Sequence, residues 1–225
     1  MNGSNRRRYM GSNIGVDENS YIQDGLVFQL DGINKGATDG TWVCLKTGRI
    51  FTANNDTYIQ SADDGFTFID GSNAFNAMTC SSALVGTTTW TMEAACSPTA
   101  WNTSAARALF TSSGRGCGLS LRGVFHWSSG SNKSWSNDIL STQKTKVTMS
   151  MNADMGLVNG EQLTTIGGGD QMTTSGFQVG SCQNKGYNFV GTIHSIRMYN
   201  RSLTLEERLH NQRIDNIRFN LGLTI

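Results

Sequence analysis

The sequence predicts an all-β protein, an antiparallel two-sheet jelly-roll sandwich with one short C-terminal helix. Three observations lead to this prediction. Apolar residues recur with a period of two in several short segments, 225 residues contain 26 glycines and one proline, and a single segment shows a helical pattern with a start signal. Short alternating segments separated by glycine-rich turns are typical of sandwiches.

Each alternating segment is expected to form a half-buried strand, with its apolar side chains in the core and its polar side chains in solvent. The segments with this pattern are 26–30, 90–96, 119–127 and 147–151. Asn159-Gly160 lies between two further short segments. It predicts a hairpin over about 155–164, because both central positions of a type I′ turn require a positive φ.

The last strand and the helix are expected near the end of the chain. Residues 187–199 are rich in β-branched and aromatic residues, and the turn formers 200–202 follow them. Thr204 with a glutamate three residues later has the pattern of a capping box. Leu205 and Leu209 lie one turn apart, so the helix is expected to press a narrow apolar stripe against a sheet.

Residues 189–207 follow the pattern F-x-G-x-I-x-x-I-R-x-Y-N-R-x-L-[ST]-x-x-E. In this respect the chain resembles the closing strand and helix of the laminin G-like, concanavalin A-like lectin and glucanase jelly rolls common in gut bacteria and their phages. Matching pieces at 25–36, 90–98 and 146–163 extend the resemblance over about residues 21–219. The resemblance implies a jelly roll, but proteins of this fold differ widely in function.

Two parts of the chain are expected to behave differently. Residues 1–20 are rich in Gly, Ser, Asn and Arg without a period and predict a flexible N-terminal arm, whereas 21–225 predict one jelly-roll domain. The net charge of +1 is too small to give an electrostatic potential that attracts nucleic acid or an anionic membrane. The basic run Arg6-Arg7-Arg8 is interpreted as a solvated or partner-bound tail in preference to a nucleic-acid contact.

No apolar run is long enough for a membrane span, and no secretory signal follows Met1. With Met1 as the native start, we expect a protein made in the cytoplasm of its host cell. The cysteines are odd in number and irregularly spaced, which predicts reduced core residues rather than disulfides or a zinc site. They are Cys44, Cys80, Cys96, Cys117 and Cys182.

The sequence predicts no enzyme. It lacks the E-x-D-x-x-E carboxylate pattern of related glycoside hydrolases, although distant carboxylates could still meet in space. It also lacks a G-x-S-x-G elbow, and His126, His194 and His210 have no recognisable Ser or Cys partner along the chain. These histidines are therefore interpreted as structural.

No cofactor is expected, with calcium as the single alternative. Laminin G-like domains often hold calcium at the rim, which makes Asp170, Asp138 and Asp31 weak candidate ligands. None of them has a second carboxylate at ligand spacing, and Asp31-Gly32 is equally typical of a turn that ends a strand.

Two tryptophans in polar segments are candidates for stacking on a sugar ring. Trp101 and Trp135 lie in the expected loops, and the side-chain amides of Asn132 and Asn137 near Trp135 could hydrogen-bond sugar hydroxyls. The alternative for each tryptophan is that it folds back over the mouth of the sandwich and closes the core.

Three functional hypotheses follow. The favoured one is a non-catalytic structural, decoration or fibre protein of a phage virion, with partner virion proteins bound through the arm, possible binding of host-surface glycans, and a homo-oligomeric state. This hypothesis rests on the resemblance, the arm and the missing signal. The alternative is a secreted or surface carbohydrate-binding module of a bacterium, and a glycoside hydrolase is the remote one.

Overall fold

The computed structural model describes residues 20–35, 40–70, 76–80, 89–101, 107–112, 115–120, 123–128, 131–136, 142–166, 177–181 and 188–225. It gives the backbone alone for 112, 115–117, 120, 123–128, 131–136, 165, 166 and 177. The strands are β1 (Leu26–Asp31), β2 (Thr41–Val43), β3 (Ile50–Ala53), β4 (Ile59–Ala62), β5 (Gly65–Phe68), β6 (Met78–Cys80), β7 (Thr91–Pro98), β8 (Arg107–Ser112), β9 (Arg115–Ser120), β10 (Gly123–Ser128), β11 (Ser131–Ser136), β12 (Val147–Asn152), β13 (Gly156–Val158), β14 (Glu161–Ile166), β15 (Phe177–Val179) and β16 (Gly191–Tyr199), and the helix is α1 (Leu205–Arg218).

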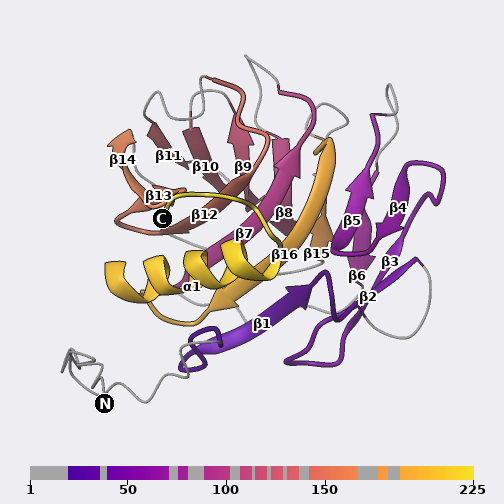
Figure 1. Cartoon of the computed structure of the whole chain (residues 1–225), viewed down its shortest axis with the longest axis horizontal. Coiled ribbons are helices and arrows are strands. Elements are labelled where there is room, and N and C mark those ends of the chain that lie inside the picture. Colours follow the sequence, from indigo (N-terminus) through magenta and orange to yellow (C-terminus); the bar gives the residue numbers. More distant parts are fainter. Residues whose placement is uncertain are drawn as a thin grey trace, which may run out of the picture.

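The strands form two antiparallel sheets, as the sequence predicts (Figure 1). The helix-bearing sheet has the order β14-β13-β12-β7-β16-β5-β4, and β1 also pairs with β16. The second sheet has the order β2-β3-β6-β15-β8-β9-β10-β11-β14. Strand β14 belongs to both sheets, because its first residues pair with β13 and its last with β11. The two sheets of the sandwich are therefore joined through β14 at one edge.

The core lies between the sheets and is rich in aromatic side chains. Phe28 packs against Phe51 and Phe110, with ring centroids 5.6 and 5.5 Å apart. The apolar positions predicted in β1, β7 and β12 are all buried. Their polar neighbours are buried too, including Gln29, Glu93 and Ser150, so the prediction of half-buried strands is wrong for β1, β7 and β12.

Helix α1 explains this burial, because it lies across the outer face of the helix-bearing sheet (Figure 1). The predicted capping box is present, with Thr204 Oγ1 accepting from the Glu207 amide and Glu207 accepting from the Thr204 amide. The predicted apolar stripe is wrong, since Leu205 is exposed and Leu209 only partly buried. The residues that α1 buries are instead mostly polar: Arg208, Asn211, Gln212, Ile214 and Asp215.

An ion pair network joins α1 to the sheet. Arg197 on β16 donates two hydrogen bonds to the Asp215 carboxylate, at 2.8 and 2.5 Å, and a third to Glu93 at 3.2 Å. Tyr21 donates to the same Asp215 carboxylate at 2.9 Å and stacks under the Arg197 guanidinium. Burial alone would lower the pKa of Arg197, but Asp215 and the other partners raise it well above its usual value. Arg197 is therefore charged in the folded protein.

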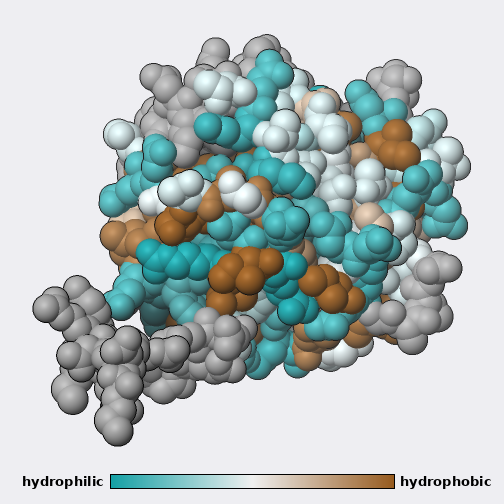
Figure 2. All heavy atoms as spheres, viewed as in Figure 1, coloured by the Kyte–Doolittle hydropathy of each residue, from teal (hydrophilic) through white to brown (hydrophobic). Residues whose placement is uncertain are grey.

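Local features of the sequence also appear as expected. Asn159 and Gly160 have positive φ and join β13 to β14, which confirms the hairpin. Cys44, Cys80 and Cys96 are buried in the core, as predicted, whereas Cys182 and the side chain of Cys117 lie outside the described part. The helix-bearing face is largely hydrophilic, with hydrophobic residues in separate spots (Figure 2).

Candidate functional site

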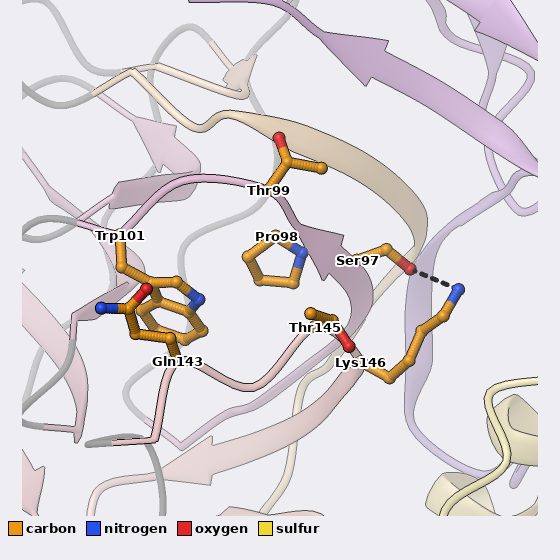
Figure 3. Close-up of a pocket in the computed structure, with 7 residues that line it drawn as sticks. All are labelled: Ser97, Pro98, Thr99, Trp101, Gln143, Thr145 and Lys146. Atoms are coloured by element: carbon orange, nitrogen blue, oxygen red, sulfur yellow. Dashed lines mark hydrogen bonds between the residues drawn. The ribbon is translucent and has the colours of Figure 1, made fainter.

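A pocket opens at the rim of the sandwich, where β7 ends and β12 begins (Figure 3). Its volume is about 450 Å³, which lies within the ~300–1,000 Å³ range of small-ligand sites. One aromatic ring, one amide, three hydroxyls and one ammonium group contribute to the lining. The lining residues are Ser97, Pro98, Thr99, Trp101, Gln143, Thr145 and Lys146.

Trp101 combines the two alternatives that the sequence leaves open. The indole is partly buried and packs against the hydrophobic core, yet it also lines the pocket. Its Nε1 donates a hydrogen bond to the Lys144 carbonyl oxygen at 3.2 Å, which fixes the ring to the segment before β12. A ring held in this way can stack on a ligand with little loss of side-chain entropy.

Gln143 lies beside Trp101 at the same end of the pocket (Figure 3). Its φ is +53°, in the left-handed region that non-glycine residues rarely adopt. Such strain costs ~1–2 kcal/mol and persists where the surrounding structure imposes it. The side chain is exposed, so its amide is available to hydrogen-bond a ligand next to the indole.

At the other end of the pocket, four side chains form a hydrogen-bonded chain. Lys146 Nζ donates to Ser97 Oγ at 3.1 Å, and Ser97 Oγ lies 2.7 Å from His194 Nε2. His194 Nδ1 lies 3.0 Å from the Asp64 carbonyl oxygen and 3.2 Å from its carboxylate. We call this series, Lys146, Ser97, His194 and Asp64, the relay.

The backbone at His194 explains why the relay forms. Ile193 pairs with Cys96 and Ser195 with Ala95, so His194 is the extra residue of a β-bulge. A bulge reorients a side chain, and here the imidazole stacks on Phe219 with ring centroids 5.3 Å apart. The ring is thereby placed between Ser97 and Asp64 on the outer face of the sheet.

The acceptors around His194 fix its tautomer. Both Asp64 oxygens near Nδ1 can only accept, so Nδ1 carries the proton and Nε2 accepts from the Ser97 hydroxyl. Burial, the main cause, lowers the pKa of His194; Asp64 opposes the shift and Lys146 adds to it. The imidazole is therefore neutral at pH 7, and the lone pairs of Ser97 Oγ face the Lys146 ammonium.

This depressed pKa predicts that stability falls in acid. The unfolded state binds a proton at His194 more readily than the folded state does. The stability that neutral His194 contributes is therefore fully present above pH 6.5, the ordinary pKa of histidine. It is lost as the pH falls from there through the lower pKa of the folded state. The loss is at most ~1.4 kcal/mol per pH unit. Urea unfolding at about pH 7.5 and about pH 5.5 should show a larger acid loss for the wild type than for His194→Gln. Equal losses would contradict the assignment.

Two of the other predicted sugar-binding residues lie on a strand and not in a loop. Trp135 and Asn132 belong to β11, where they pair with Val124 and Trp127, so the expected loop there is a hairpin of β10 and β11. Their side chains lie outside the described part, as does all of Asn137. Of the four predicted residues, the described pocket lining contains Trp101.

Of the three calcium candidates, Asp31 is the one that lies within the described residues. Asp31 is buried, accepts from the amides of Ile33 and Asn34 in the turn after β1, and pairs with Arg218 at 2.8 Å. Asp138 and Asp170 lie outside the described residues. Among the residues described, no group of three or more His, Cys, Asp or Glu side chains is arranged to hold a metal ion.

His210 and His126 are the remaining histidines, and the structure describes the side chain of His210 alone. His210 on α1 contacts the Ser20 carbonyl oxygen at 2.8 Å and so ties the N-terminal end of the domain to the helix. The side chain of His126 lies outside the described part. No helix in the described ranges has the length and apolar character that crossing a membrane requires.

Comparison with known proteins adds information about the fold. No protein-family model matches the sequence, and no curated protein matches it significantly. The structure is similar to the binding domain of botulinum neurotoxin DC in complex with rat synaptotagmin II, with a TM-score of 0.57, 14% identity, and coverage of 85% of this chain and 52% of that one. The same toxin domain in complex with SialylT gives a TM-score of 0.53 at 13% identity, with 85% and 52% covered.

Trypanosoma rangeli sialidase in complex with the inhibitor DANA is a further match, with a TM-score of 0.53 and 16% identity. This chain is covered over 87% of its length but spans only 34% of the sialidase. Identities this low concern the fold alone. The likenesses agree with a jelly-roll-like sandwich of two antiparallel sheets.

Proposed function

We propose that this protein is a non-catalytic glycan-binding jelly roll, related to the laminin G-like, concanavalin A-like family. The pocket at Trp101 carries the proposal, because a fixed aromatic ring beside an amide and several hydroxyls is the chemistry that proteins use to hold a sugar. Two similar structures support the same function, since one is a sialidase in complex with the inhibitor DANA and the other a toxin binding domain in complex with SialylT.

The experiment that tests the proposal replaces Trp101. Trp101→Ala should raise the Kd for a bound glycan about tenfold, the equivalent of ~1.4 kcal/mol, because the ring loses its stacking surface. Trp101→Phe should retain part of the affinity. Binding is measured on a glycan array and then by titration calorimetry with the strongest ligand.

Leu45→Ala is the matched control, because Leu45 is an exposed apolar residue in the turn between β2 and β3, outside the pocket. It should leave the affinity unchanged. If Trp101→Ala folds normally and binds the glycan as the wild type does, the pocket is not the binding site.

The non-catalytic part of the proposal is supported by the relay itself. Asp64, His194 and Ser97 follow the order of a nucleophilic triad, but a catalytic histidine must take up the serine proton. Burial, the largest cause, and the Lys146 ammonium oppose an imidazolium at His194 more than Asp64 favours it, so the pKa of His194 is lowered. We therefore expect a fluorophosphonate to leave Ser97 unlabelled. Labelling of Ser97 would make it a nucleophile and overturn this part.

We further propose that the protein belongs to a phage virion, as a structural, decoration or fibre protein bound to other virion proteins through the arm of residues 1–20 and present in several copies. Many copies would convert weak glycan binding into firm attachment to a host cell. The alternative is a secreted or surface module of a bacterium. Mass spectrometry of purified particles, cell envelope and culture medium separates the two.

A further inference from the structure

We propose that the pocket selects sugars that carry a carboxylate, with Lys146 as the group that binds the carboxylate and Ser97, His194 and Asp64 as positioning residues for its ammonium. The inference rests on the proposed glycan-binding function and adds a ligand class to it. Three features of the described residues support it: the unpaired charge of Lys146, the relay behind it, and its place relative to Trp101.

The charge of Lys146 is not balanced by a neighbour. Among the described residues, no carboxylate oxygen lies within 4.0 Å of its Nζ, and the pocket lining contains no Asp or Glu. Its hydrogen bond in this part of the chain goes to the neutral Ser97 hydroxyl. By contrast, the Lys35 ammonium donates to two carbonyl oxygens, of Ala62 and Gly65. Lys146 retains donors for an anionic ligand.

The relay restricts where this ammonium can lie. Ser97 gives its hydrogen to His194 and therefore presents lone pairs to Lys146. His194 is fixed by Asp64 on one side and by Phe219 on its face, with 2% of its side chain exposed. A free lysine side chain loses considerable rotamer entropy when it binds. A lysine that is already anchored loses less, so its contact with a carboxylate contributes more to affinity.

The arrangement of the pocket matches a ligand with a ring and a charge at opposite ends. Trp101 and Gln143 lie at one end and the Ser97–Lys146 pair at the other (Figure 3). A sugar ring stacked on the indole would extend its carboxylate, or that of the next sugar, toward Lys146. Sialic and uronic acids share this chemistry, and neutral sugars lack it.

The test compares acidic and neutral probes on the full chain. Titration calorimetry compares sialyllactose with lactose, and glucuronic acid with glucose, so that a sialic acid and a uronic acid are tested separately. For the wild type, we expect the acidic member of at least one pair to bind about tenfold tighter, as a charge-assisted hydrogen bond would provide. Lys146→Met should remove this preference by weakening acidic binding far more than neutral binding, and Lys146→Arg should retain most of it. Raising the salt concentration should weaken acidic binding alone.

The positioning role is tested at Ser97. Ser97→Ala should weaken acidic binding severalfold more than neutral binding, and Ser97→Thr, which keeps the hydroxyl, should restore the acidic preference. A residue needed only for folding would weaken both affinities equally.

The outcomes distinguish the two proposals. Equal wild-type affinity for acidic and neutral probes, or an acidic preference that survives in Lys146→Met, would overturn the inference and leave glycan binding intact. If the wild type binds no glycan on the array, the proposed function fails and the inference fails with it.

Discussion

Replacing Asp215 by alanine should destabilise the protein by ~3–5 kcal/mol, the largest loss expected from one side chain. Asp215 accepts two hydrogen bonds from Arg197 and one each from Tyr21 and Ser195, and both members of the ion pair are almost fully buried. Without the carboxylate, the Arg197 guanidinium stays buried with Glu93 as its remaining charged partner. The free energy of unfolding is measured by urea titration, with circular dichroism as the signal.

Asp24→Ala is the matched control for this variant. Asp24 also pairs with an arginine, Arg201, at 2.8 Å, but its side chain is 84% exposed. Water and salt screen such a pair, so its removal should cost ~1 kcal/mol or less. If Asp215→Ala costs no more than Asp24→Ala, the network beneath α1 is not what secures the helix.

The second large effect is expected at Gly191, the first residue of β16. Its φ is +131°, and a Cβ there would collide with the Ser97 carbonyl oxygen and lie 2.8 Å from Pro98 Cα. Gly191→Ala should therefore destabilise the protein by ~3 kcal/mol or more, since a strained backbone and an overpacked contact combine. The same variant should disturb the pocket, because Ser97 and Pro98 line it.

Gly48→Ala separates these two causes. Gly48 also has a positive φ, +69°, but a Cβ there would meet no atom within 4 Å. It should lose only the ~1 kcal/mol that a left-handed conformation imposes on alanine. Similar losses at both positions would show that the close approach of β16 to β7 is unimportant.

Features that depend on neighbouring residues could be predicted from the sequence. The hairpin at Asn159-Gly160 and the capping box at Thr204 each arise from a few adjacent residues, and both are present. The apolar positions predicted in β7 and β12 are also buried in the structure, because alternate residues of a strand point to the same face and the apolar face packs against the core. This local information was sufficient for the fold class.

Features that depend on distant partners could not be predicted. The buried polar face of α1 looks exposed in the sequence, and its burial is favourable because distant residues such as Arg197, Glu93 and Ser150 on the sheet hydrogen-bond it. No motif in the sequence links His194 to a serine, yet a bulge brings it to Ser97, 97 positions away. Trp135 looked like a loop residue because the strand around it is rich in serine. For the pocket, the sequence therefore indicated Trp101 and missed Lys146.

The position of β16 has a consequence for how the chain is made. This strand pairs with β1, β5 and β7, all of which precede it by about a hundred residues or more. During synthesis these three strands leave the ribosome before their common partner, and their edges stay open until residues 191–199 have been translated. Tyr21 also forms its hydrogen bond late, because Asp215 follows it by 194 positions. The domain is therefore expected to fold slowly, as a single cooperative event that follows the synthesis of β16 and α1.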